Sequence, residues 1–128
     1  FNTFGGNPIA AAAGRAVLDV IKTEELQQNA LEVGRYLMDC LRALPHQAIG
    51  DVRGSGLFIA VELVLDRNAK TPDAAITSRI VNGLRERRIL ISASGPNANI
   101  LKIRPPLVFK REHADMLVSA VDDVLKTA

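Results

Sequence analysis

The sequence has little of several features that mark specialised proteins. Among its 128 residues it contains one cysteine, no tryptophan, one tyrosine and four phenylalanines. A single cysteine, Cys40, allows no internal disulfide, which is typical of proteins in a reducing compartment, and the cytoplasm is the predicted location. The two isolated histidines, His46 and His113, offer no cluster of metal ligands, so a metal site is not expected.

Strong charge of one sign and long apolar runs are also missing. The chain has 16 basic and 14 acidic residues scattered along its length, for a net charge of +2, so nucleic acid is not an expected partner. No segment approaches the roughly 18 consecutive apolar residues of a membrane span. With 48% hydrophobic and 23% charged residues, the composition is typical of an ordinary globular domain.

The first part of the chain has the spacing of helices. Asn7 and Pro8 have the residue types of an N-cap and a first helical position, and the predicted helix runs to about Lys22. This helix is apolar on nearly every side and is therefore expected to be buried. Thr23 is predicted to cap a second helix with one apolar stripe, which Pro45 ends.

The period changes from residue 50 onward. The stretch GDVRGSGLFIAVELVL alternates around Gly54-Ser55-Gly56 and predicts a β-hairpin. Its apolar face is expected to hold Leu57, Ile59, Val61, Leu63 and Leu65.

Three further segments complete the predicted fold. Thr71-Pro72-Asp73 opens a helix, and two strands within residues 89–94 and 99–105 flank the turn Gly95-Pro96-Asn97. A last helix starts at about Arg111. The order α-α-β-β-α-β-β-α predicts an α+β domain in which helices cover one face of a mainly antiparallel sheet.

Two segments are candidates for binding an anion. Thr3 and the glycines Gly5 and Gly6 precede a helix N-terminus, whose backbone amides and dipole favour a phosphate. The alternative is a loop threonine beside a plain turn. In NILKIRPP, strand alternation places Lys102 and Arg104 on one face, where two cations can bind a carboxylate or a phosphate. The alternative there is a pair of solvated cations.

Other polar features are interpreted as structural. Gly54-Ser55-Gly56 lacks the third glycine and the βαβ context of a phosphate-binding fingerprint. Cys40 is interpreted as a small helical residue rather than a nucleophile. Asp122 and Asp123 on the last helix are interpreted as exposed, solvated charges.

Three blocks of sequence resemble a known family. TFGGNP leading into AVLDVI, then GDVRGSGLFIAVELV, then LKIRPPLVFKREHADMLVSAVDDVL resemble, in order, the C-terminal third of the class III (ω-type) aminotransferases. Within the family, the residues of these motifs are most similar to the ethanolamine-phosphate phospho-lyase branch. The resemblance implies the C-terminal small domain of a fold-type I enzyme that uses pyridoxal 5'-phosphate. Residues 1–22 then end the large cofactor domain and form a connecting helix, and residues 23–128 form the small domain.

The resemblance also implies roles for individual residues. In this family the threonine of TFGGNP contacts the phosphate of a cofactor held mainly by the neighbouring subunit, which makes Thr3 a cofactor-binding residue and a homodimer the expected assembly. The lysine that binds the cofactor covalently lies upstream of TFGGNP. We therefore expect this chain to be a fragment without a catalytic residue of its own, inactive alone.

The substrate implied is a small primary amine. Many family members grip a substrate carboxylate with an arginine three residues before the first proline, and here that position holds Lys102. Lysine does not reproduce the bidentate arginine fork, and the phospho-lyase branch has lysine here, so Lys102 and Arg104 are the candidate substrate-binding residues. Transamination and phosphate elimination both stay open. A hypothesis of another class is a stand-alone small-molecule-binding or dimerisation module without catalysis.

Overall fold

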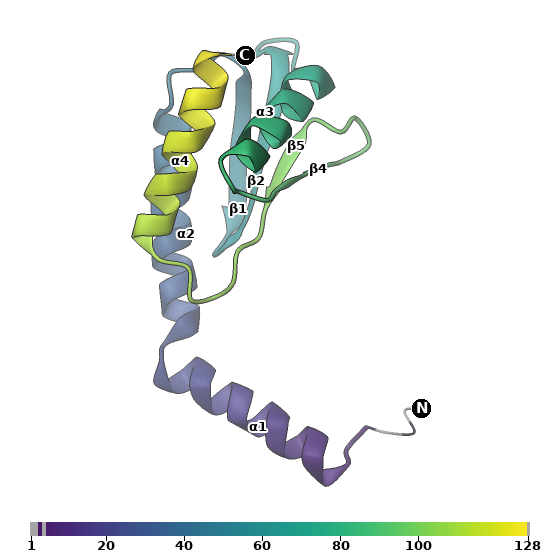
Figure 1. Cartoon of the computed structure of the whole chain (residues 1–128), viewed down its shortest axis with the longest axis vertical. Helices are drawn as coiled ribbons and strands as arrows, with labels where there is room; N and C mark the ends of the chain where they lie inside the picture. The colour runs from purple at the N-terminus through teal and green to yellow at the C-terminus, as the bar shows by residue number, and fades with distance from the viewer. Residues whose placement is uncertain (1–2, 4, 128) are drawn as a thin grey trace.

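The computed structural model describes residue 3 and residues 5–127 and shows an α+β arrangement (Figure 1). Its helices and strands are α1 (Pro8–Thr23), α2 (Leu26–Ala43), β1 (Ile49–Ser55), β2 (Phe58–Asp66), β3 (Thr71–Pro72), α3 (Ala74–Glu86), β4 (Ser92–Ser94), β5 (Ile100–Ile103) and α4 (Arg111–Lys126). The strands pair in the order β1-β2-β5-β4, all antiparallel, and the short β3 pairs with β2. The predicted order of elements is confirmed, with β3 as an addition.

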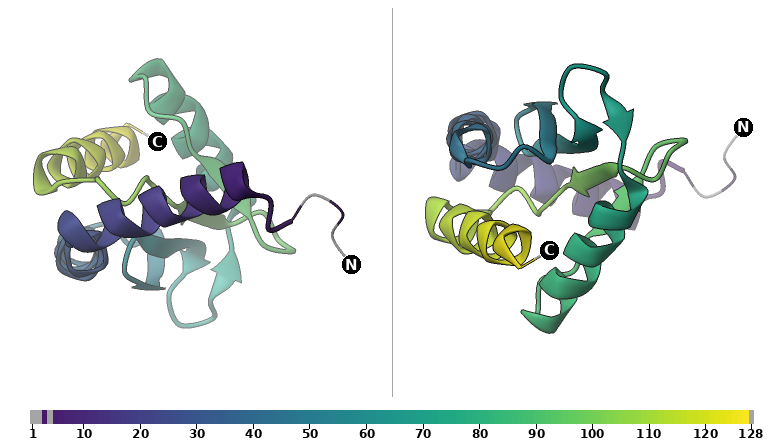
Figure 2. Two further views of the ribbon diagram at one scale, coloured as in Figure 1. Left: turned by 90° about the horizontal axis from the view of Figure 1, so that it is seen from below. Right: turned by 90° about the horizontal axis from the view of Figure 1, so that it is seen from above.

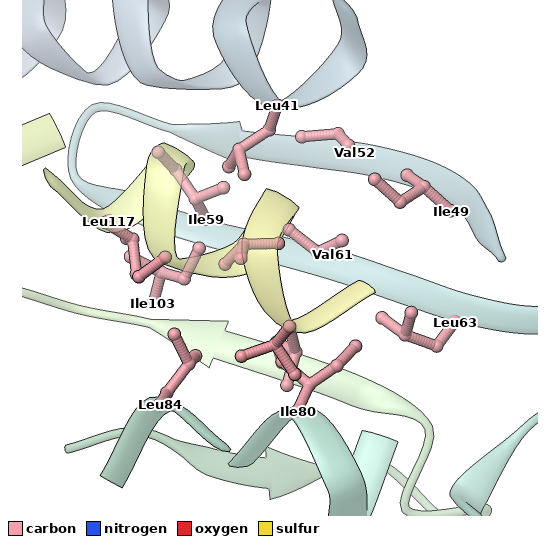
Figure 3. Packing of buried hydrophobic residues seen from close by; sticks show 14 of the residues in the cluster. Leu41, Ile49, Val52, Ile59, Val61, Leu63, Ile80, Leu84, Ile103 and Leu117 are labelled. Carbon is pink, nitrogen blue, oxygen red and sulfur yellow. The ribbon is translucent and has the colours of Figure 1, made fainter. Parts of the chain in front are cut away.

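The hydrophobic core lies between one face of the sheet and the helices α2, α3 and α4 (Figure 2). Figure 3 shows Leu41 of α2, Ile80 and Leu84 of α3 and Leu117 of α4 directed toward the sheet residues. The central strand β2 supplies Ile59, Val61 and Leu63, each at most 1% exposed. Alternation along the strands therefore leaves the opposite face of the sheet free of these three helices.

The β1–β2 hairpin turns tightly against helix α2. Ser55 pairs with Phe58, and Gly56 between them has a φ of +53°, a conformation that favours glycine. On the helix side, a Cβ atom at Gly34 would collide with the backbone carbonyl of Gly56. The two glycines thus allow the backbones of α2 and the hairpin to meet without side chains between them.

Several sequence-based expectations need correction. Thr23 does not cap the second helix: it is the last residue of α1, and the chain bends at Glu25, whose φ of 50° is left-handed. On β2, Leu65 is 68% exposed and Val64 is buried instead, because the pairing of β2 with β3 shifts register between Val64 and Asp66. The strand predicted within residues 89–94 is confined to Ser92–Ser94.

Helix α1 projects from the rest of the domain (Figure 1), and none of its residues is buried. Ile9 is 83% exposed and Val17 58%, so the burial expected for this apolar helix is not found within this chain. Its N-cap is as predicted, with the Asn7 side chain accepting a hydrogen bond of 3.0 Å from the Ala10 amide. Across the described residues, no helix has both the length and the apolar character that crossing a bilayer requires.

We predict that Gly34→Ala destabilises the domain. The added methyl group must push α2 away from the Gly56 carbonyl, and overpacking of this kind costs about 1–3 kcal/mol. Urea unfolding of the chain measures the change in the free energy of unfolding. Gly14→Ala in α1 is the matched control, since its Cβ meets nothing within 4 Å. An unfolding free energy equal to that of the wild type in Gly34→Ala would show that the close approach is unimportant.

Candidate functional site

Lys102 lies in the middle of β5, on the face of the sheet opposite the helices. Its neighbours in the chain, Leu101 and Ile103, are buried in the core, and Lys102 itself is half-buried. Directly across from it stand Ala60 on β2 and Ser92 on β4. Because both cross-strand neighbours are small, the lysine side chain has open space on each side.

Two clefts meet at Lys102. The first, which we call the edge cleft, has a volume of about 390 Å³ and is lined by Ile89, Ser92, Lys102, Arg104, His113 and Met116 among others. The second, the sheet-face cleft, has about 360 Å³ and is lined by Arg53, Phe58, Ala60, Ser94, Ile100 and Lys102 among others. Both volumes are in the range of small-molecule sites.

Arg104 follows β5 and is exposed. Although it lies beyond the last residue of β5, it lines the edge cleft together with Lys102, which brings the two candidate cations together. His113 lines the same cleft, and its Nδ1 accepts a hydrogen bond of 3.1 Å from the Lys110 amide at the start of α4. The edge cleft is therefore a cationic cleft with an apolar floor.

Arg53 is a feature of the sheet-face cleft that the sequence analysis did not single out. Its Nη1 donates to Asp51 Oδ2 at 2.8 Å and to Glu62 Oε2 at 2.6 Å. The hydrogen bonds to Asp51 and then to Glu62 raise the pKa of the guanidinium above its ordinary value. The sequence contained one indication of this contact. Alternation within the predicted hairpin places Arg53 and Glu62 at positions that face away from the core.

Thr3 is exposed and precedes a turn in which Gly6 has a φ of +79°. The helix N-terminus after it is less available to an anion than expected. Pro8 has no amide hydrogen, the Ala10 amide donates to the Asn7 side chain, and the Ala11 amide donates to the Asn7 carbonyl. Thr3 lines neither cleft that contains Lys102, so this chain does not bring its candidate cofactor and substrate residues together.

The lysines other than Lys102 lie at helix ends or in a loop. Lys22 and Lys126 lie in the last turns of α1 and α4, Lys70 lies in the loop before β3, and Lys110 is the N-cap of α4. Within residue 3 and residues 5–127, no group of three His, Cys, Asp or Glu side chains is placed to hold a metal ion.

Asp122 is not the solvated charge that the sequence suggested. Its Oδ1 lies 2.7 Å from Nε2 of His46, in the loop after α2, and its Oδ2 lies 2.5 Å from Nζ of Lys126. The hydrogen bonds from Lys126 and then His46 lower the pKa of the Asp122 carboxyl. The contact joins the C-terminal part of α4 to the loop that enters β1. Asp123 is exposed, as expected.

A family model matches almost the whole chain. Residues 1–125 match the model of class III aminotransferases. The chain therefore belongs to the class III aminotransferase family, as the three sequence blocks predicted.

The names of similar proteins in the family refer to more than one reaction. The chain is 50% identical over 124 residues to alanine–glyoxylate aminotransferase 2 homolog 2, mitochondrial, of Arabidopsis thaliana, covering 95% of this chain and 26% of that protein. It is 44% identical over 128 residues to ethanolamine-phosphate phospho-lyase homolog 1 of Caenorhabditis elegans, covering 98% and 27%. The chain thus spans about a quarter of the length of these relatives.

Solved structures show the same architecture. A phospholyase from Arthrobacter, determined in complex with phosphoethanolamine, superposes with a TM-score of 0.92 at 42% identity, over 100% of this chain and 31% of that one. A PLP-bound amine transaminase from an uncultivated Pseudomonas species gives a TM-score of 0.86 at 36% identity, over 98% and 29%. The chain has an architecture found in part of a phospholyase and in part of an amine transaminase.

We predict that Asp122→Asn lowers the free energy of unfolding at pH 7. The native pKa of Asp122 lies below its ordinary value, so its contribution is complete above about pH 4 and is lost as the pH falls through the native pKa. The difference between wild type and variant in chemical unfolding should therefore shrink in acid. Asp123→Asn is the matched control on the same helix. A difference that stays constant down to the native pKa would contradict an ionic role for Asp122.

Proposed function

We propose that this chain is the C-terminal part of a pyridoxal-phosphate enzyme that removes phosphate from a small phosphorylated amine of the O-phosphoethanolamine type. The observation that carries the proposal is Lys102 in place of the arginine that grips a carboxylate in many family members. Lys102 is half-buried between two clefts, beside small neighbours, with no carboxylate of the described residues within ion-pair distance. A compact ammonium charge suits a phosphate, whereas a planar carboxylate is better matched by an arginine fork.

The comparisons support this choice of reaction. Two of the similar proteins are a phospho-lyase homologue and a phospholyase determined with phosphoethanolamine. In the proposal, Lys102 holds the substrate phosphate, and the edge cleft around it accepts a molecule of this size. The amine end of the substrate reacts outside this chain, at the cofactor.

Transamination is the second candidate, and Arg104 favours it. This arginine lines the edge cleft together with Lys102 and presents a guanidinium that can bind a carboxylate. The similar alanine–glyoxylate aminotransferase homologue and the amine transaminase belong to that reaction class. In this version Arg104 replaces Lys102 as the main contact to the substrate anion.

The residues of this chain fit one part of a cofactor site. The Thr3 hydroxyl, exposed ahead of a glycine turn, can donate one hydrogen bond to the cofactor phosphate. Pyridoxal phosphate, when bound, supplies an electron sink for charge that develops beside the amine nitrogen. The lysine that anchors the cofactor and abstracts the proton lies outside this chain in our proposal, which makes the chain inactive alone.

The proposal also covers assembly and organisation. Thr3 is donated across a homodimer interface, residues 1–22 belong with the cofactor domain, and residues 23–128 form the small domain. The exposed apolar residues of α1 support this division, because a stand-alone binding module would leave Ile9 and Val17 in water. We place the enzyme in the cytoplasm, with the mitochondrion as the alternative that one relative's name suggests.

We predict that the full-length enzyme, loaded with cofactor, releases phosphate from O-phosphoethanolamine with no oxo acid present. Lys102→Met should raise the KM about 10-fold to 100-fold, the effect of losing one charge-assisted hydrogen bond of about 1.5–3 kcal/mol. Arg104→Met, which removes the neighbouring cation, is the matched control and should change the KM less. A colorimetric assay of released phosphate measures the KM of the wild type, Lys102→Met and Arg104→Met.

A loaded, folded enzyme that releases no phosphate but transfers the amino group to an oxo acid would contradict the lyase proposal. If Arg104→Met weakens the binding of a carboxylate substrate in that enzyme, transamination with Arg104 as the clamp replaces the proposal. Phosphate release with an unchanged KM in Lys102→Met would leave the proposed reaction in place and contradict the role of Lys102.

We predict that Thr3→Ala in the full-length enzyme weakens cofactor binding. Losing one charge-assisted hydrogen bond to a phosphate costs about 1.5–3 kcal/mol. Titration of the cofactor-free enzyme with pyridoxal phosphate, followed by absorbance, measures the affinity. Thr23→Ala, which removes an exposed threonine at the other end of α1, is the matched control. Equal affinities in both variants and the wild type would make Thr3 a loop residue.

A further inference from the structure

Glu62 stands between two cations on the open face of the sheet. On β2, Glu62 is two residues beyond Ala60, and Ala60 is directly opposite Arg53 on one side and Lys102 on the other. Glu62 is therefore diagonal to both cations. Diagonal neighbours in an antiparallel sheet are separated by about 7–8 Å, which long charged side chains can span.

The structure shows which cation Glu62 binds. Its Oε2 accepts from Nη1 of Arg53 at 2.6 Å, and the same nitrogen donates to Asp51 at 2.8 Å. Lys102 has no ion pair among the described residues, although it shares the sheet-face cleft with Arg53. Arg53 thus binds the carboxylates of both Asp51 and Glu62 on this face.

We infer that Arg53 is a positioning residue for substrate affinity: by holding Glu62, it leaves the charge of Lys102 free to bind the substrate anion. This inference rests on the proposed role of Lys102. Without Arg53, Lys102 is still diagonal to Glu62, and a Lys102–Glu62 pair would compete with the anion. The substrate would then have to displace an internal carboxylate before it could bind.

An alternative is that Arg53 only ties β1 to β2. The two roles predict different effects when Glu62 is removed in addition to Arg53. If Arg53 only joins the strands, removing Glu62 as well cannot restore the protein, because the contact is still lost. If Arg53 acts by occupying Glu62, removing the competing carboxylate restores the binding of the substrate anion.

The test compares variants of the full-length, cofactor-loaded enzyme, with KM and kcat for O-phosphoethanolamine as readouts. Arg53→Gln should raise the KM about threefold to fivefold, the size that competition from an exposed ion pair reaches, with little change in kcat. The double variant Arg53→Gln/Glu62→Gln should return the KM to near the wild-type value. Arg42→Gln is the matched control, because Arg42 also contacts β1, through the Val52 carbonyl, but lines neither cleft of Lys102.

The outcomes separate this inference from the proposed function. If Arg53→Gln leaves the KM unchanged while Lys102→Met raises it, the inference is wrong and the role of Lys102 stands. If the KM rises in Arg53→Gln and stays high in the double variant, Arg53 has a structural role and the inference is again wrong. If Lys102→Met itself has no effect on the KM, the proposed role of Lys102 fails and the inference fails with it, whereas an enzyme that releases no phosphate contradicts the proposed function.

Discussion

Strand β2 is the element on which the rest of this structure depends, because it is paired on both sides and buried on one face only. Ile59, Val61 and Leu63 must lie under the helices, since each carries apolar surface that water would otherwise contact. That requirement sends Ala60 and Glu62 to the opposite face. The pairing register then brings Arg53 and Lys102 to the same face, one from each flanking strand.

Two groups of charged side chains are paired within the domain. Arg53 binds two carboxylates on the open face, and Asp122 is held by His46 and Lys126 near the C-terminal end of α4. Lys102 is half-buried beside small neighbours and has no ion pair among the described residues. In our proposal this arrangement suits an anion, because no carboxylate of the described residues has to be displaced first.

Much of the fold was predictable from local patterns. The helical stripe of α2, the alternation of β1 and β2 and the Asp73 cap of α3 are all encoded over short distances, and the structure shows each of them. The errors have tertiary causes. Leu65 is exposed rather than buried, because the pairing of β2 with β3 shifts register beside it. Thr23 belongs to α1 rather than to the start of α2, because the bend between the helices occurs at Glu25. Neither cause is visible in a window of a few residues.

The candidate site divides in the same way. The sequence by itself determined that Lys102 lies on a strand between two core residues and that the chain belongs to the class III aminotransferases, because alternation and residue order are properties of the chain. Only the tertiary structure decided that Glu62 binds Arg53 rather than Lys102, and that Asp122 binds His46. These are choices between partners far apart in sequence, and strand register and helix packing settle them by bringing particular side chains within reach.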